Sequence, residues 1–286
     1  MLLIKFTHRE VIALKQDLKA ICRDIRCDIL TSIGHLGVGH IGGCLSVVEL
    51  LAALYFEEMQ IDPADPKKEG RDRFVCSKGH AGPAVYAALA GRGYFDKKEL
   101  LTLNQGGTDL PSHCDMNRTK GIDMTTGSLG QGFSCAVGVA LGSQLAGDNA
   151  TIYTLIGDGE SQEGQIWEAA MFAAAKHLDR LIAFTDYNKL QIDGPVSEVN
   201  DIAPLSDKWR AFGWNVIDVA NGNDVEEVLS AIRKAKEMRG SGKPTMVILN
   251  TVKGCGVKWI EELGPGNHNT NITEEQANEA IAQIRG

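Results

Sequence analysis

The first sixty residues carry a helical pattern of apolar positions. Apolar side chains recur at spacings of three and four between His8 and Ile33, which predicts one long amphipathic helix. It ends in a glycine-rich turn, GHLGVGHIGG, and Ser46 and Glu49 then form an S-x-x-E pattern ahead of the apolar run LLAALYF. Serine and glutamate at this spacing can bond reciprocally with free backbone N–H groups at a helix start. We therefore expect a second helix to begin at Ser46.

Beyond this region, short apolar runs alternate with helical patterns. Five runs rich in β-branched residues predict strands at 73–77, 151–156, 180–186, 214–220 and 244–252. Helical patterns lie between most of them, including 132–146, 166–178 and 224–238. Strands that are apolar on both faces and alternate with helices are typical of a parallel sheet covered on both sides. We expect residues 1–286 to form a single doubly wound α/β domain with a mostly parallel sheet.

Composition and charge exclude several classes of function. Lys and Arg number 29 against 37 Asp and Glu, a formal net charge of -8 without long blocks of either sign, so nucleic acid is not an expected partner. No apolar run approaches the roughly 18 residues of a membrane span, and the N-terminus lacks the apolar stretch of a signal peptide. The seven cysteines are scattered without a C-x-x-C pair, which indicates reduced thiols in a soluble cytoplasmic protein.

Polar side chains follow two predicted strands where each strand ends. The stretch LIGDGESQEG runs from an apolar strand into Asp158, between two glycines, and Asn188 follows the next strand thirty residues later. Because ligands bind beyond the carboxyl ends of parallel strands, these oxygens are expected side by side. Such donors suit a Mg²⁺ ion that also binds phosphate, with a helix start near Gly164 as further support for the anion. GDG alone, however, is more typical of a tight turn.

GDG followed by an asparagine thirty residues later, and then by NK and IDG, resembles the thiamine diphosphate binding motif. In that motif, the acid and the asparagine hold the metal that binds the diphosphate. The resemblance implies metal ligands at the side chains of Asp158 and Asn188 and at the main-chain carbonyl of Leu190. The metal is expected to be Mg²⁺, for which Mn²⁺ or Ca²⁺ would substitute.

Further blocks resemble transketolase and stand in transketolase order. They are GHIGGCLS (39–46), DRFVCSKGHAGPAVYAAL (72–89), SHCDM (112–116), TTGSLGQGFSCAVGVAL (125–141) and TVKGCG (251–256). The resemblance extends from about residue 10 onward and covers the first of the three transketolase domains, the one that binds the diphosphate. It implies transfer of a two-carbon glycolaldehyde unit from a ketose phosphate to an aldose phosphate.

Four of the seven histidines belong to this pattern: His40, His80, His113 and His268. Each alone is equally typical of a turn or core histidine, but together they suit proton transfer near pH 7, where imidazole titrates. By resemblance, His40 and His113 lie around the reacting carbonyl and hydroxyls of the donor, and His80 and His268 reach the diphosphate and substrate. His35 competes for the first role, but the pattern GHxGGxLS selects His40, so His35 is interpreted as structural or substrate-specific.

The resemblance also implies a set of cofactor contacts: His80, Gly127, Ser128, Leu129, Gly159, Glu163, Asn188 and Ile192. Gly127 would face the aminopyrimidine and Leu129 the cofactor rings, in a stretch that is also a glycine-rich helix start. Glu163 and Glu168 resemble a carboxylate relay between two active sites, although acids are favoured near any helix N-terminus. No role is assigned to Glu160.

The resemblance implies that a partner is needed. In transketolases, the glutamate that activates thiamine diphosphate comes from the second domain, usually of the other subunit, and this chain stops before such a domain. We expect a partner subunit with the pyrimidine-binding and C-terminal domains, in an α2β2 assembly, and sugar phosphates as substrates.

The chain departs from the family pattern around the expected sugar site. Ile41 and Cys114 stand where prolines are usual, and Gly266, Asn267 and Asn269 replace the usual neighbours of the last histidine. These changes favour a donor other than xylulose 5-phosphate, such as a branched or modified ketose phosphate. Alternatives are a subunit of a deoxyxylulose-phosphate synthase or of a 2-oxo acid dehydrogenase, and a noncatalytic binding module.

Overall fold

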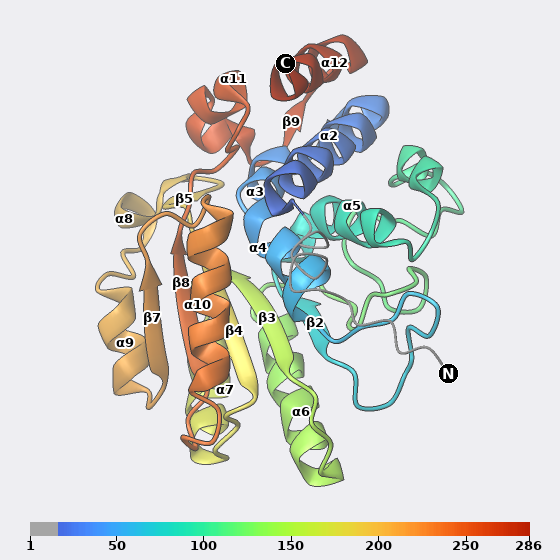
Figure 1. Ribbon diagram of the computed structural model, residues 1–286. Helices are drawn as coiled ribbons and strands as arrows, with labels where there is room; N and C mark the ends of the chain where they lie inside the picture. Colours follow the sequence, from blue (N-terminus) through green and yellow to red (C-terminus); the bar gives the residue numbers. More distant parts are fainter. Residues whose placement is uncertain (1–16) are drawn as a thin grey trace, which may run out of the picture.

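A five-stranded parallel sheet forms the centre of the computed structural model, which describes residues 17–286 (Figure 1). The strand order is β2-β3-β4-β8-β7, and every neighbouring pair is parallel. The strands are β2 (Arg73–Cys76), β3 (Ile152–Gly157), β4 (Leu181–Tyr187), β7 (Asn215–Val219) and β8 (Thr245–Asn250). All five predicted strands are therefore confirmed, each boundary to within two residues.

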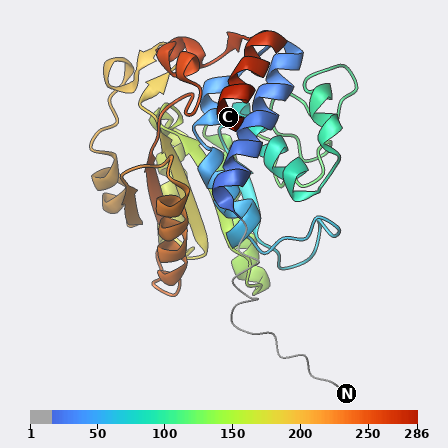
Figure 2. The same cartoon turned by 45° about the horizontal axis from the view of Figure 1, so that its top comes forward.

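Helices cover both faces of the sheet, because alternate strand residues point to opposite sides. Tyr153 and Leu155 of β3 belong to one buried apolar cluster, whereas Ile152 and Ile156 belong to the other. The first cluster packs α2 (Leu18–Leu36), α4 (Val48–Ala53), α5 (Gly82–Arg92), α10 (Val225–Glu237) and α12 (Glu274–Arg285). The second packs α6 (Gln131–Ala146), α7 (Gly164–Ala175) and α9 (Leu205–Ala211). The layers of this doubly wound α/β fold are visible in Figures 1 and 2.

Short elements connect the strands and the longer helices. They include β1 (Val38–Gly39), α3 (Ile41–Leu45), β5 (Leu190–Gln191), β6 (Gly194–Pro195), α8 (Val196–Val199), α11 (Lys258–Glu262) and β9 (Thr270–Asn271), the π-helix η1 (Leu54–Glu58), and 3-10 turns at Gly79–Ala81, Lys97–Thr102, Glu160–Gln162 and Gly264–Asn267. β1 pairs antiparallel with β9, and β5 with β6. The first pairing joins segments more than 200 residues apart.

The bounds of the first described helix differ from the prediction. α2 begins at Leu18 because the Asp17 side chain caps it, accepting from the backbone N–H groups of Lys19 and Ala20 at 3.1 Å each. It continues to Leu36 instead of ending at Ile33, and Gly37 terminates it at φ 91°. The predicted portion at residues 8–16 lies outside the described residues.

The predicted capping box at Ser46 and Glu49 is wrong. α4 begins at Val48, and the buried Ser46 hydroxyl instead donates to Asp186 Oδ2 at 2.7 Å. Glu49 accepts from Arg26 Nη2 at 2.6 Å in a buried ion pair. Both side chains bond to partners far away in the sequence, which a local capping pattern cannot reveal.

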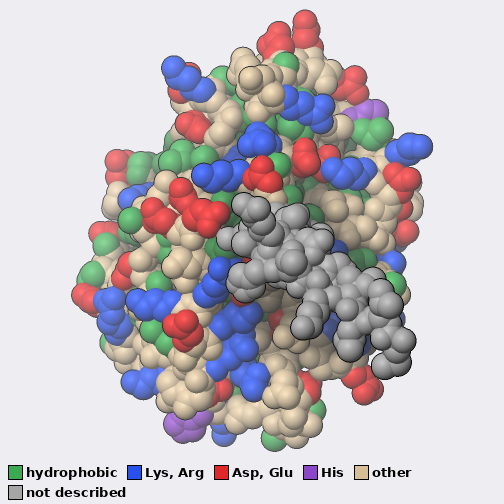
Figure 3. Space-filling view, viewed as in Figure 1, with side chains coloured by type: hydrophobic (Ala, Val, Ile, Leu, Met, Phe, Trp, Pro, Cys, Tyr) green, Lys and Arg blue, Asp and Glu red, His purple; other side chains and the backbone are tan. Residues whose placement is uncertain are grey.

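Charges of both signs lie interspersed over most of the face seen in Figure 3. Within residues 17–286, none of the helices has both the length and the apolar character that crossing a membrane requires. All seven cysteines lie in this described part, as free thiols.

Two glycines of α6 provide a matched test of its packing. A Cβ at Gly132 would lie 2.7 Å from Ser77 Cα, whereas a Cβ at Gly142 would meet nothing within 4 Å. We expect Gly132→Ala to lower the free energy of unfolding by about 1–3 kcal/mol, because backbone must shift. Gly142→Ala should be neutral or stabilise the chain by up to about 1 kcal/mol. Urea unfolding of the purified chain measures both, and equal effects would contradict this account of α6.

Candidate active site

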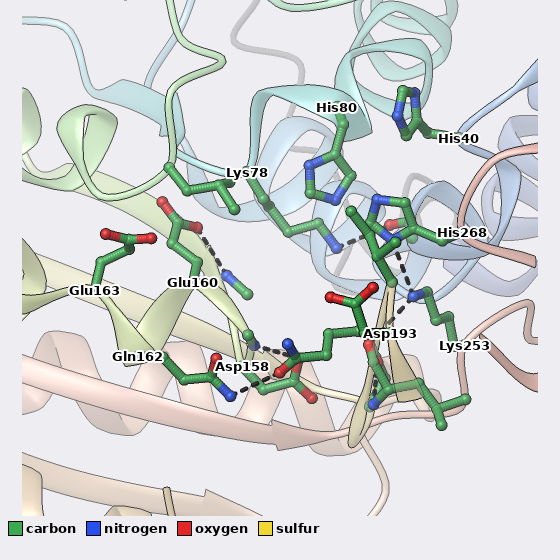
Figure 4. A pocket seen from close by; sticks show the side chains of 18 of the residues that line it. His40, Lys78, His80, Asp158, Glu160, Gln162, Glu163, Asp193, Lys253 and His268 are labelled. Atoms are coloured by element: carbon green, nitrogen blue, oxygen red, sulfur yellow. Dashed lines mark hydrogen bonds between the residues drawn. The ribbon is translucent and has the colours of Figure 1, made fainter. Parts of the chain in front are cut away.

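A cavity of about 360 Å³ opens beyond the carboxyl ends of β2, β3 and β4 (Figure 4). Lys78 follows β2, Asp158 follows β3 and Asn188 follows β4, and all three line the cavity. Because neighbouring parallel strands end at one edge, residues distant in sequence meet there. The predicted juxtaposition of Asp158 and Asn188 is therefore present in the structure.

All four predicted histidines line this cavity. The ring centroid of His40 lies 5.4 Å from that of His80, 5.6 Å from that of His113 and 5.4 Å from that of His268. The rings of His80 and His268 are 5.0 Å apart. The four residues come from different segments: the turn before α3, the 3-10 turn after β2, a loop before α6, and the turn before β9. Proton-transferring groups thus surround one small volume.

The histidine cluster is held in its neutral form. Burial lowers the pKa of His40, His80 and His113. Burial, reinforced by the positive charge of Lys253, lowers the pKa of His268 to about 3. A neutral imidazole offers one donor and one acceptor nitrogen, so each ring can both hold a hydroxyl group and accept a proton.

Oxygen atoms gather at the GDG turn. Asp158 is 3% exposed, and its Oδ1 accepts from Gly159 N at 2.8 Å while its Oδ2 accepts from Lys189 N. Asn188 Oδ1 accepts from Leu190 N at 3.1 Å, and the Leu190 carbonyl accepts from Lys253 Nζ at 3.2 Å. Burial and the nearby Asp186 charge raise the pKa of Asp158 to about 7. A buried carboxylate in this state would be stabilised by a cation.

This donor set fits a magnesium ion. Carboxylate, amide and backbone oxygens are the ligands that Mg²⁺ takes when phosphates and water complete its octahedron. Within residues 17–286, no three His, Cys, Asp or Glu side chains are arranged to hold a metal. A metal here would therefore rely on one acid, with amide and carbonyl oxygens as further ligands.

Two lysines contribute charge that the sequence analysis did not assign. Lys78 is fully buried, and its Nζ donates to Asp186 Oδ2 at 2.6 Å and to Gly43 O at 3.0 Å. Lys253 Nζ lies 3.1 Å from His268 Nδ1, and burial together with Lys78 lowers the pKa of Lys253 to about 8. Both lysines belong to sequence blocks that resemble transketolase, Lys78 in SKGH and Lys253 in TVKG. The sequence alone gave no reason to prefer these two lysines over the others as site residues.

Glu160 is a further residue to which the sequence analysis assigned no role. It is 2% exposed, and its carboxylate accepts from Gly130 N at 2.8 Å and from Gly157 N at 3.0 Å. The Ser77 hydroxyl also donates to it. Glu160 thereby joins the TGSLG loop to the GDG turn and the end of β2. One partner, Gly157, is three residues away, but the two contacts that join separate segments come from residues 30 and 83 positions away, which no local pattern reveals.

The remaining predicted residues divide between the cavity and its surroundings. Five line the cavity: Gly127, Leu129, Gly159, Glu163 and Ile192. Ser128 is exposed beside the cavity and does not line it. Glu168 is exposed on α7, and His35 pairs with Glu274 at 2.8 Å on the surface, so both lie outside the cavity. This contact joins α2 to α12, which agrees with the interpretation of His35 as a structural residue.

The rim of the cavity is apolar and open. Leu129 is 37% exposed and Ile192 is 65% exposed, and Glu163, which also lines the cavity, is exposed as well. Two exposed apolar side chains therefore stand at the opening of the cavity.

The parallel α/β sheet places an acid and an asparagine, thirty residues apart, at neighbouring strand ends, which is the arrangement that the resemblance to the thiamine diphosphate binding motif implies. The family model described as "Transketolase, thiamine diphosphate binding domain" matches residues 17–283. The chain belongs to the transketolase family and represents its thiamine diphosphate binding domain.

Named relatives agree with this assignment. The chain is 58% identical to the 6-deoxy-6-sulfo-D-fructose transketolase subunit SqwG of Clostridium sp. (strain MSTE9), over 94% of this chain and 96% of the relative. It is 39% identical to an apulose-4-phosphate transketolase subunit of Phocaeicola vulgatus, over 86% of each chain. The transketolase structure from Leishmania mexicana superimposes with a TM-score of 0.88 at 31% identity, over 94% of this chain and 41% of that one.

The neutral histidines predict a pH dependence of stability. The pKa of His268 is about 3 in the folded chain against 6.5 ordinarily, so the unfolded chain binds an extra proton below pH 6.5. The contribution of the neutral His268 ring to the free energy of unfolding is therefore fully present above pH 6.5 and is lost as the pH falls. Urea titrations at pH 7.5 and 5.5 measure how far the free energy of unfolding falls between the two pH values. His268→Asn should make this fall smaller by at most about 1.4 kcal/mol.

The exposed His177, whose Nδ1 contacts the Gly242 carbonyl at 3.0 Å, provides the control. His177→Asn replaces a histidine outside the cavity by the same residue, so the comparison of the two variants isolates the effect of the buried ring. If His268→Asn also loses as much stability as the unmodified chain between the two pH values, the burial of a neutral His268 is contradicted.

Proposed function

We propose that this chain is the N-terminal subunit of a transketolase that depends on thiamine diphosphate and Mg²⁺. It transfers a glycolaldehyde unit from a ketose donor to an aldose phosphate acceptor. The observation that carries the proposal is the cavity itself, where the oxygens of Asp158, Asn188 and Leu190 lie below four converging histidines. The proposal treats residues 1–286 as one domain, and the free cysteines suit a reducing compartment such as the cytoplasm.

The metal and cofactor would be held by different parts of the cavity. Asp158, Asn188 and the Leu190 carbonyl are the proposed metal ligands, with Mn²⁺ or Ca²⁺ as substitutes for Mg²⁺. The proposed cofactor contacts are His80, Gly127, Ser128, Leu129, Gly159, Glu163, Asn188 and Ile192. When bound, thiamine diphosphate supplies a carbanion that attacks ketose carbonyls. The nearby Lys253 provides positive charge for a diphosphate.

The histidines of this chain orient the sugar and move its protons. His40 and His113 are proposed to hold the donor carbonyl and the adjacent hydroxyls. His80 and His268 reach toward the diphosphate and substrate. Because all four rings are neutral at pH 7, each can accept a hydroxyl proton and return it. Closure of the cavity by a partner would exclude water from these transfers.

The partner in this proposal is a C-terminal subunit with the pyrimidine-binding and C-terminal domains, which supplies the activating glutamate. Two observations support it. This chain matches subunits over nearly their whole length but spans only 41% of the transketolase from Leishmania mexicana. Its apolar rim at Leu129 and Ile192 is exposed. An α2β2 assembly would pair two such cavities.

The proposed donor is 6-deoxy-6-sulfo-D-fructose. The support is the 58% identity with a subunit named for that sugar, against 39% for the subunit named for apulose 4-phosphate. The departures from the family pattern at Ile41, Cys114 and Asn269 lie beside His40, His113 and His268 in the sequence, although none of the three residues lines the cavity itself.

Removal of the proposed metal ligand tests the mechanism. In a complex with the product of the adjacent reading frame, Asp158→Ala should lower the rate of C2 transfer by at least about 100-fold, because the cation loses its only carboxylate. The control is Asp207→Ala, which removes an exposed acid of α9 that pairs with Arg210. Comparable rates for the two variants would exclude Asp158 from the reaction. Activity of the chain without a partner would refute the split enzyme.

Donor competition tests the substrate. The complex, supplied with thiamine diphosphate and Mg²⁺, should use 6-deoxy-6-sulfo-D-fructose with a kcat/KM at least about 10-fold above that for xylulose 5-phosphate. Mass spectrometry would detect the four-carbon sulfo-aldose that remains. Preference for apulose 4-phosphate would replace the proposed donor, and activity with pyruvate alone would indicate a different reaction.

A further inference from the structure

A buried acid lies directly behind the proposed metal ligands. Asp186, near the end of β4, is 0% exposed and forms an ion pair with Lys78, which is 2% exposed. Burial of two charges is costly unless they are paired and their remaining hydrogen bonds are made. Asp186 itself does not line the cavity, yet it contacts Asn188, which does.

Four donors occupy the Asp186 carboxylate. Its Oδ2 accepts from Lys78 Nζ at 2.6 Å, from Ser46 Oγ at 2.7 Å and from Asn188 Nδ2 at 2.8 Å. Its Oδ1 accepts from the Thr251 hydroxyl. Three of the four donors reach Oδ2 and one reaches Oδ1, so both oxygens of the carboxylate are paired. Its negative charge is matched by the positive charge of Lys78.

The Asn188 amide is held at both ends, because its Nδ2 donates to Asp186 and its Oδ1 accepts from Leu190 N. A terminal amide has two orientations that exchange its oxygen and nitrogen, and only the oxygen can bind a metal. Because ionised Asp186 is purely an acceptor, it favours the orientation in which Nδ2 points toward it. Asn188 Oδ1 is then directed to the other side, where Leu190 N donates to it at 3.1 Å. The opposite orientation would place two acceptor oxygens against each other.

We propose that Asp186 is a positioning residue that selects the metal-binding orientation of Asn188, and that Lys78 neutralises it for this task. The inference rests on the proposed metal site. Loss of such an orienting contact typically weakens metal affinity 10–100-fold. Ser46 and Thr251 donate to the same carboxylate, and neither side chain has a hydrogen bond to Asn188 among the described residues.

The test measures binding of Mn²⁺ to the chain–partner complex by electron paramagnetic resonance, with thiamine diphosphate present and a protein-free control. Asp186→Asn should weaken Mn²⁺ binding about 10–100-fold, because its own amide no longer specifies how Asn188 points. Thr251→Val, which removes a donor to the same carboxylate, should change the affinity by less than about 3-fold.

A double-mutant cycle separates positioning from general damage. If Asp186 acts through Asn188, then Asp186→Asn should cost no further affinity in an Asn188→Ala background. If the two substitutions weaken Mn²⁺ affinity independently, so that the factor for the double variant is the product of the two single factors, the positioning role is overturned. Failure of the unmodified complex to bind Mn²⁺ would overturn the metal site and the inference together, which is a distinguishable result.

A second variant covers the case in which Asp186→Asn leaves Lys78 unpaired and the chain fails to fold. Lys78→Gln combined with Asp186→Asn replaces the ion pair by two neutral amides of similar volume, so no unpaired charge is buried. This double variant should unfold near the midpoint of the unmodified chain while its Mn²⁺ affinity falls about 10–100-fold. Unchanged affinity in a folded double variant would refute the proposal.

Discussion

The ion pair of Lys78 and Asp186 is the interaction on which the site depends. It holds together segments that follow α3, β2, β4 and β8, through bonds to Ser46, Lys78, Asn188 and Thr251. Removal of one partner from such a buried pair typically costs about 3–5 kcal/mol, because the other charge is left uncompensated. The strand ends can therefore approach closely although several of their side chains are polar. The cavity lies in front of this anchor.

The charged side chains around the cavity favour a ligand that carries both positive and negative charge. Burial raises the pKa of Asp158 to about 7 and lowers that of Lys253 to about 8, so neither group is fully stabilised in its charged form. A cation beside Asp158 and an anion beside Lys253 would relieve both penalties. A metal diphosphate has this character, which agrees with the proposed cofactor. The neutral histidines above them add hydrogen bonds without adding charge.

The fold was largely predictable because its signal is local. Apolar runs rich in β-branched residues marked all five strands, and their alternation with helices indicated a parallel sheet. The blocks around Asp158, Asn188 and the four histidines also identified most of the cavity. The errors at Ser46 and Glu49 have one cause: a polar pattern that can cap a helix can equally make distant contacts, and Asp186 and Arg26 are those contacts.

The sequence by itself determined the order of the strands along the chain, the family and the residues that follow each strand end. Only the tertiary structure decided that Glu160 joins two loops, that Lys253 approaches the Leu190 carbonyl and that Asp186 contacts Asn188. Strand identity follows from the hydropathy of a few neighbouring residues. The partners of a buried charge depend on which strand ends become neighbours, and the sheet order places β8 beside β4 although about sixty residues separate them.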